Sequence, residues 1–170
     1  MNIYKFHSNP DELIGHTSRN FYFGDEAKEL ILQGKEVTKV IGTLYLSGTP
    51  ITALPDNLTV QGDLYLDGTA ITALPDNLTV GGTLVLSGTA ITALPDNLTV
   101  HEDLYLNGTP IRSLPDNLTV QGYLGLSGTK ITSLPDNLKV GGDLWINSTP
   151  NLDTNNLPSS LVVKGNIRYK

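Results

Sequence analysis

The side chains best suited to chemistry in this chain are aromatic and acidic residues that recur at intervals of twenty positions. Large rings stand between two aliphatic residues in several copies of one short segment, at Tyr45, Tyr65, Tyr105 and Trp145. The same position holds Val85, Gly125 and Arg168 in other copies. Because side chains alternate along a strand, this column is expected to point away from a core built by its aliphatic neighbours. Exposed rings of this kind are typical of binding surfaces.

Carboxylates flank the aromatic column and give it an acidic rim. The sequence therefore predicts a partner-binding surface composed of Tyr45, Tyr65, Tyr105, Trp145, Asp63, Asp67, Asp103 and Asp143. Its natural complement is another protein with a basic or mixed apolar surface. Gly125 is expected to leave a gap beside Tyr105 and Trp145 into which a partner side chain inserts. The alternative interpretation is that the rings only stack on one another along a sheet.

A second column of carboxylates follows a proline in each copy. Its members are Asp56, Asp76, Asp96, Asp116 and Asp136. The column lacks the paired oxygen ligands of a calcium site, and aspartate after proline is common in turns. We therefore predict a turn here, with no metal and no cofactor.

A third group consists of residues that differ from the other copies, between His101 and Lys139. Arg112, Tyr123 and Lys130 form a secondary candidate site. Arg112 and Lys130 occupy nearby columns on adjacent copies, so they are expected to form a small basic spot away from the aromatic column. A merely solvated surface is the alternative.

These columns require a repeating framework. The twenty residues from Leu64 to Thr83 begin again, nearly unchanged, at Leu44, Leu84, Leu104, Leu124 and Leu144. Such a period is the signature of a solenoid in which each turn buries its apolar edge against the next. Gly68 suits a backbone position with positive φ, and Pro75 favours a turn. We expect a mainly β repeat solenoid with stacked parallel strands.

The pattern L-x-L-x-x-T-x-I-x-x-L-P-x-x-L resembles the leucine-rich repeat, in particular the short Leu-Pro type of bacterial effector proteins. The resemblance implies a right-handed superhelix with one parallel strand per 20-residue turn. It also implies a bacterial or phage protein that acts as an inhibitor or effector. Where that family has asparagine this chain has threonine, as at Thr69, whose hydroxyl can still bond nearby backbone groups. A right-handed parallel β-helix, with a second strand near Val80 and a Gly81-Gly82 corner, is the alternative.

The ends of the chain depart from the period. Residues 1–40 are predicted to form an N-terminal cap with short helices, one starting at Asn9-Pro10 and one over Asp25 to Gln33, stopped by Gly34. Residues 41–150 form the repeat solenoid. Residues 151–170 form an irregular last turn with about three extra residues near Asp153 to Asn156. All three segments are expected to make one structural domain.

Composition narrows the function classes. The net charge is −6, which disfavours nucleic acid as a partner. The chain has no cysteine, so a disulfide framework and a cysteine nucleophile are excluded. Neither an export signal nor an apolar run of ~20 residues is found, so a cytoplasmic protein that does not enter membranes is expected.

We therefore predict a non-enzymatic protein-binding module. Two alternatives from other classes remain. A row of rings with nearby carboxylates also suits carbohydrate binding, and a purely structural rod that self-associates is compatible with the same repeats.

Overall fold

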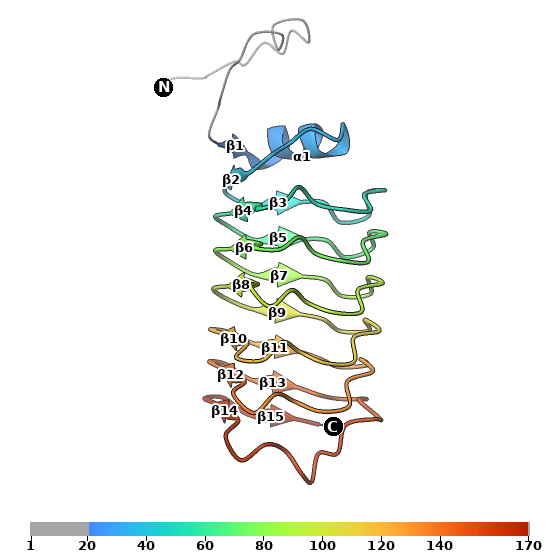
Figure 1. Cartoon of the computed structure of the whole chain (residues 1–170), viewed down its shortest axis with the longest axis vertical. Helices are drawn as coiled ribbons and strands as arrows, with labels where there is room; N and C mark the ends of the chain where they lie inside the picture. Colours follow the sequence, from blue (N-terminus) through green and yellow to red (C-terminus); the bar gives the residue numbers. More distant parts are fainter. Residues whose placement is uncertain (1–20, 170) are drawn as a thin grey trace, which may run out of the picture.

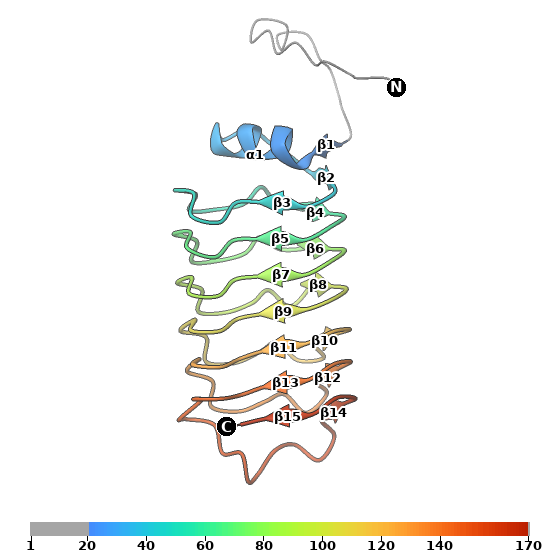
Figure 2. The same ribbon diagram turned by 180° about the vertical axis from the view of Figure 1, so that it is seen from behind.

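The computed structural model describes residues 21–169, which wind into a parallel β-solenoid of about 7 turns (Figure 1). Viewed from behind, the turns stack in the same order along the long axis (Figure 2). Successive turns pair in a register of one repeat, as in Leu64 opposite Leu84 and Tyr65 opposite Val85. The predicted mainly β repeat solenoid is confirmed.

Each turn contributes one short strand to each of two parallel sheets. The 8-stranded sheet has the order β1 (Tyr22–Phe23), β2 (Lys39–Ile41), β4 (Thr59–Val60), β6 (Thr79–Val80), β8 (Thr99–Val100), β10 (Thr119–Val120), β12 (Lys139–Val140), β14 (Val162–Val163). The 7-stranded sheet has the order β15 (Ile167–Arg168), β13 (Leu144–Trp145), β11 (Leu124–Gly125), β9 (Leu104–Tyr105), β7 (Leu84–Val85), β5 (Leu64–Tyr65), β3 (Leu44–Tyr45).

The expectation of one strand per turn is wrong, and the alternative with a second strand describes the cross-section better. The β-branched pair Thr79–Val80 favours extended backbone and pairs with the turns on both sides. A glycine corner then leads into β7. A Cβ atom on Gly81 would lie only 2.2 Å from the carbonyl oxygen of Gln61, so glycine is required for this close approach.

The core lies inside the coil and consists of aliphatic columns. In one turn the buried members are Leu84, Leu86, Ile91, Leu94, Leu98 and Val100. One threonine per turn is also buried from the second turn onward, at Thr69, Thr89, Thr109, Thr129 and Thr149. Thr69 donates its hydroxyl hydrogen to the carbonyl of Leu66 at 2.7 Å, so the threonine satisfies its own polar group as predicted. Gly68 has φ +68°, the left-handed conformation that its column was predicted to need.

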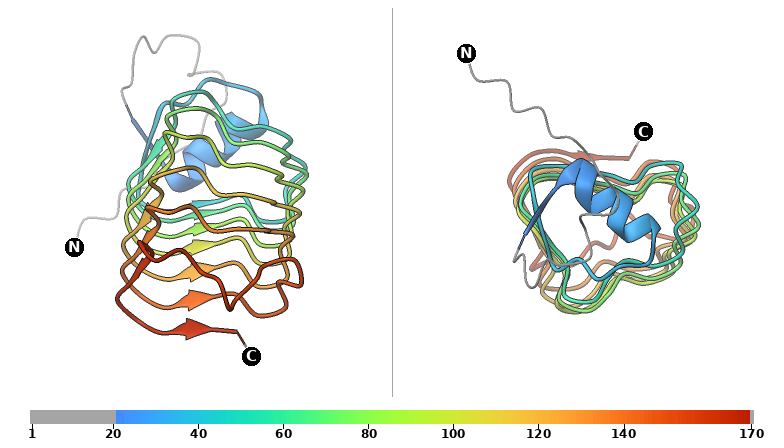
Figure 3. Two further views of the ribbon diagram at one scale, coloured as in Figure 1. Left: turned by 60° about the horizontal axis from the view of Figure 1, so that its bottom comes forward. Right: turned by 90° about the horizontal axis from the view of Figure 1, so that it is seen from above.

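The N-terminal end of the coil is covered by a helix. Helix α1 (Gly24–Leu32) packs across β3, and the end-on view shows it lying over the coil (Figure 3). Ala27 and Ile31 are the buried residues of this helix. Gly34, with φ +69°, follows its C-terminal end, so the predicted helix with a glycine stop is confirmed. Within residues 21–169 no helix has the length and apolar character that a membrane crossing requires.

The predicted helix start at Asn9-Pro10 lies outside the described residues.

The C-terminal turn is longer than the others. Asp143 and Asn166 occupy equivalent positions 23 residues apart, whereas the equivalent pair Asp63 and Thr83 is 20 residues apart. The irregular last turn with about three extra residues is therefore confirmed. Residues 150–161 carry the insertion, and the chain returns to register in β14 and β15.

One step in the 8-stranded sheet is looser than its neighbours. Between β6 and β4, the backbone N–H of Thr79 donates to Leu58 at 3.0 Å and that of Gly81 to Val60 at 2.8 Å. Between β10 and β8 only Val120 and Val100 are paired, and within the described chain the equivalent bonds from Thr119 and Gln121 are not formed.

We call the step between β8 and β10 the seam. The corner residues on its two sides are His101 and Gln121. A surface hollow of about 200 Å³ lies there, lined in part by Leu98, Val100 and Thr119.

Candidate functional site

The predicted aromatic column is formed in the structure. Tyr65 pairs in register with Tyr45 and with Val85, and the 7-stranded sheet continues this column through Tyr105, Gly125, Trp145 and Arg168. Tyr45 and Trp145 keep 57% and 48% of their surface exposed, so two of the large rings are largely in solvent. Tyr65 and Tyr105 are half-buried. The aliphatic residues on either side of these rings are buried, as the alternation along a strand requires.

Tyr45 and Tyr65 form a stacked pair at the N-terminal end of the column. Their ring centroids are 5.0 Å apart and the ring planes differ by only 13°. Such a pair contributes about 0.5–1.5 kcal/mol beyond its buried area. Stacking along the sheet therefore occurs here, but it leaves more than half of the Tyr45 surface exposed.

Tyr105 is held by the acidic rim. Its hydroxyl donates to Asp103 Oδ2 at 3.1 Å. Partial burial, followed by this hydrogen bond, raises the pKa of Tyr105 above its ordinary value. Burial, followed by the nearby charge of Asp63, raises the pKa of Tyr65 in the same way. Both rings therefore present a neutral phenol at physiological pH.

The expected gap at Gly125 is absent. A Cβ atom on Gly125 would lie 2.9 Å from Asn107 Nδ2 and 3.1 Å from Tyr105 Cδ1. The side chains of the preceding turn therefore lie over Gly125, which is itself buried. The sequence showed the missing side chain but not that a neighbouring ring and amide fill its space.

The aspartates beside the aromatic column link successive turns. Asp63 Oδ1 accepts the backbone N–H of Thr83 at 2.8 Å, and Asp103 Oδ1 accepts that of Tyr123 at 2.7 Å. Asp143 Oδ1 accepts the N–H of Asn166 at 2.7 Å. These carboxylates therefore accept hydrogen bonds from backbone N–H groups just before the strands of the 7-stranded sheet begin. This structural role was not predicted from the sequence. Each still has acceptor capacity for a partner, because a carboxylate offers about four lone-pair sites.

Asp143 also carries an ion pair. Arg168 Nε lies 3.2 Å from Asp143 Oδ2. The hydrogen bond from the Asn166 backbone, helped by Arg168, lowers the pKa of Asp143 below its ordinary value. Asp143 is thus partly neutralised within the chain itself.

The position after the second aliphatic residue is polar and also bridges turns. Asp67 Oδ1 accepts the hydroxyl hydrogen of Ser47 at 2.6 Å, and Asn107 Oδ1 accepts the backbone N–H of Ser127 at 3.0 Å. Asp67 therefore lies on the predicted surface, with part of its acceptor capacity used internally.

The exposed face has a period of two turns, which the 20-residue repeat conceals. One set of turns carries an aspartate, a large ring and an Asp or Asn, as in Asp63-Leu64-Tyr65-Leu66-Asp67. The turns between them carry smaller residues at most of these positions, as in Thr83-Leu84-Val85-Leu86-Ser87. A comparison of every second copy of the repeat, instead of adjacent copies, would have revealed this alternation from the sequence. Tyr65, Tyr105 and Trp145 thus stand two strands apart.

The secondary candidate site is divided by the structure. Tyr123 belongs to the aromatic column's face, because its backbone is bonded to Asp103 and it is 47% exposed. Arg112 and Lys130 lie on a different side, on adjacent turns. The backbone N–H of Lys130 donates to Ile111 at 3.1 Å and that of Thr132 donates to Arg112 at 3.2 Å. Both basic side chains are exposed there.

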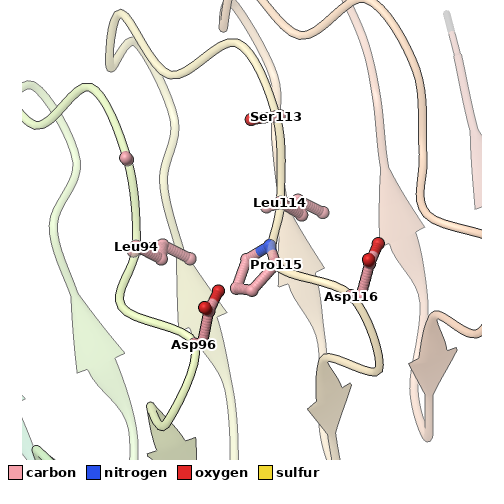
Figure 4. Close-up of a pocket in the computed structure, with 7 residues that line it drawn as sticks. Leu94, Asp96, Ser113, Leu114, Pro115 and Asp116 are labelled. Carbon is pink, nitrogen blue, oxygen red and sulfur yellow. The ribbon is translucent and has the colours of Figure 1, made fainter. Parts of the chain in front are cut away.

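The turn column of aspartates lies on a third side of the coil. Figure 4 shows Asp96 and Asp116 on successive turns, on either side of Pro115, at a hollow of about 320 Å³. Leu94 and Leu114 line the same hollow. Among residues 21–169, no group of three or more His, Asp or Glu side chains is placed to hold a metal ion.

We call the surface made by Tyr45, Tyr65, Tyr105, Tyr123, Trp145, Asp63, Asp67, Asp103 and Asp143 the aromatic face. Its rings and carboxylates lie on the strands of the 7-stranded sheet or directly beside them, and its only basic side chain among the described residues is Arg168. Comparison with known proteins finds no protein-family model that matches this chain and no significant match among curated proteins.

Proposed function

We propose that this protein is a non-enzymatic binding module that holds another protein on its aromatic face. The observation that carries the proposal is the exposure of Tyr45 and Trp145, at 57% and 48%, on one continuous sheet. Large rings left in water are favourable where a partner buries them, and Tyr and Trp are enriched at the energetic centres of interfaces.

The framework suits this use because it fixes the rings before binding. Tyr65, Tyr105 and Trp145 lie on strands that pair with a neighbour on both sides, whereas Tyr45 lies on the edge strand β3. The aliphatic residues beside all four rings are buried. A rigid surface loses little side-chain and backbone entropy when a partner docks. The rings of Tyr65 and Tyr105 are further restrained by Tyr45 and Asp103.

The charge of the face favours a basic or mixed apolar partner. Four carboxylates, from Asp63, Asp67, Asp103 and Asp143, accompany the rings, and one of them is paired with Arg168. Complementary charge steers association and rejects acidic competitors. We propose that the protein works in the cytoplasm as an inhibitor or effector, by occupying a surface of its partner.

The test is affinity capture with a matched pair of variants. Wild-type protein, a Tyr65→Ala/Tyr105→Ala/Trp145→Ala variant and an Arg112→Ala/Lys130→Ala variant are each immobilised and exposed to the same lysate. The proposal expects a protein that is retained by wild type and by the Arg112/Lys130 variant and lost from the triple variant. Retention by all three variants, or loss only from the Arg112/Lys130 variant, contradicts it.

Carbohydrate binding is the alternative function for the aromatic face. A glycan array probed with wild type and the triple variant separates the two. Signal on glycans that disappears in the triple variant, with no protein captured, favours carbohydrate binding instead.

A further inference from the structure

We infer that the segment held on the aromatic face is a basic, proline-rich stretch in the polyproline II conformation, lying along the long axis of the solenoid. This inference rests on the proposed function and names the chemistry of the partner. Two observations carry it: the two-turn spacing of the rings, and the placement of carboxylates with the same spacing.

The spacing of the rings matches one turn of polyproline II. Adjacent strands lie about 4.8 Å apart, so rings two strands apart are separated by about 9.6 Å along the axis. A polyproline II helix has three residues per turn and rises about 3.1 Å per residue, which gives about 9.3 Å per turn. Every third residue of such a segment therefore meets Tyr65, Tyr105 and Trp145 in succession.

Other backbone conformations fit the three rings less well. A β-strand repeats its side-chain direction every two residues, or about 6.7 Å, which falls out of step within one ring interval. An α-helix brings residues i and i+7 to one side at about 10.5 Å, so its mismatch over two intervals is about 2 Å. For polyproline II the mismatch over the same two intervals is about 0.6 Å.

No second large ring of the column stands between Tyr65 and Tyr105 or between Tyr105 and Trp145. Val85 lies between Tyr65 and Tyr105, and Gly125 lies between Tyr105 and Trp145. Large rings therefore alternate with small residues along this column, and the side chains of Tyr105 and Asn107 lie over Gly125. Proline rings pack on Tyr and Trp faces, and a segment already in polyproline II loses little entropy on docking.

The carboxylates repeat at the same interval. Asp63, Asp103 and Asp143 each stand two residues before a large ring, on the same turns as Tyr65, Tyr105 and Trp145. A basic residue at every third position of the segment thus meets a carboxylate whenever a proline meets a ring. The carboxylates and the rings thus repeat at the same two-turn interval. This shared interval favours a basic, proline-rich segment over a neutral one.

The chain itself displays how a guanidinium binds this column. Arg168 stands one turn beyond Trp145, and its Nε lies 3.2 Å from Asp143 Oδ2. Asp63 and Asp103 hold the equivalent position on their turns, but the next turn places Val85 and Gly125, not arginine, opposite their rings. A partner arginine takes the corresponding place at Asp63. At Asp103 it is a second donor beside the hydroxyl of Tyr105, which already donates to Oδ2.

The test uses synthetic peptides and the single tryptophan of the chain, Trp145, as the reporter. The probe is a peptide of four Pro-Pro-Arg triplets. The controls are four Gly-Gly-Arg triplets, which keep the charge and spacing but not the polyproline II conformation, and a Pro-Arg peptide of the same composition with its arginines clustered at one end. Binding is followed by the fluorescence of Trp145 and by calorimetry.

We expect the Pro-Pro-Arg peptide to bind at least ~10-fold more tightly than either control, because only it combines the conformation with the period. Tyr105→Ala and Asp103→Asn each weaken its binding, whereas Asp96→Ala in the turn column leaves it unchanged. Equal binding of the three peptides overturns the inference, because charge alone then accounts for the affinity.

Failure of this inference is distinguishable from failure of the proposed function. If none of the peptides binds, while a captured protein is lost from the Tyr65/Tyr105/Trp145 triple variant, the aromatic face binds a different kind of segment and only the inference is overturned. If no protein is lost from the triple variant either, both are overturned.

Discussion

Asp103 Oδ1 accepts a hydrogen bond from the backbone N–H of Tyr123, one turn further along the solenoid, at 2.7 Å. The same oxygen lies 2.0 Å from where a Cβ atom on Gly122 would stand, so the carboxylate fits over a glycine of the next turn. Asp103 therefore belongs both to the aromatic face and to the bonding between turns. Its two roles can be separated by the choice of substitution.

Asp103→Ala is expected to destabilise the fold by about 1 kcal/mol, because the N–H of Tyr123 and the hydroxyl of Tyr105 lose their acceptor. Asp103→Asn is expected to cost less, because its side-chain oxygen can still accept from Tyr123. Denaturation with urea measures both variants, with Asp96→Ala as the control. Equal losses for the alanine and asparagine variants contradict the assigned bond.

Leu86→Ala is expected to destabilise the fold by about 2–5 kcal/mol, because Leu86 is fully buried and the change leaves a cavity in the core. The matched control is Val85→Ala, one residue earlier on the exposed side of the same turn, for which we expect a loss below about 1 kcal/mol. Melting curves of the two variants test the prediction. A melting temperature of Leu86→Ala equal to that of wild type contradicts the register of the solenoid.

The seam between β8 and β10 is expected to open more easily than the other steps of the 8-stranded sheet. Thr119 and Gln121 lack the inter-turn bonds that the equivalent N–H groups of Thr79 and Gly81 make. We therefore predict faster hydrogen exchange at Thr119 and Gln121 than at Thr79 and Gly81. Amide exchange followed by NMR checks this. Equal protection at the four sites means that the sheet is uniform across the seam.

The carboxyl of Asp143 is expected to make the fold sensitive to acid. Its folded-state pKa is lowered, first by the N–H of Asn166 and then by Arg168, whereas in the unfolded chain it returns to about 3.9. A lowered folded pKa means that the stabilising contribution is present above about pH 4 and is lost as the pH falls through the folded value.

The pKa of Asp143 can be measured by NMR titration. Arg168→Met is expected to raise it toward its ordinary value, and the control Lys164→Met is expected to leave it unchanged, because Lys164 is an exposed residue of the corner. A pKa at the ordinary value in wild type contradicts the assigned contacts of Asp143.

The sequence predicted much of this architecture because each structural demand is repeated. Leu64 and Leu66 recur as a buried pair, Gly68 recurs where φ is positive, and Thr69 recurs where a hydroxyl bonds the backbone. A single copy of any of these residues is ambiguous, but a column of copies at one interval has one explanation. The extra residues of the last turn were visible for the same reason, as a shift in the interval.

Other features of the structure could not be predicted from the repeat pattern. They depend on contacts between turns, and the sequence of a single turn does not specify those contacts. The second strand, Thr79–Val80, is only two residues long and is defined by its neighbours, not by alternation. The link from Asp63 to the N–H of Thr83 joins residues 20 apart, so a rim of carboxylates looked like a purely external surface. The cover over Gly125 likewise comes from Asn107 and Tyr105 of the preceding turn.

The central claim is that the aromatic face binds a partner protein, and Trp145→Ala tests it most directly. Trp145 is 48% exposed and, among the described aromatic residues, has no stacked ring, so its removal should hardly change the melting temperature. Titration of the captured partner by calorimetry should show binding to Trp145→Ala, Tyr65→Ala and Tyr105→Ala weakened by about 1–2 kcal/mol each. Wild-type affinity in all three variants, with binding lost in Arg112→Ala or Lys130→Ala, would contradict the account and move the working surface to the other side of the coil.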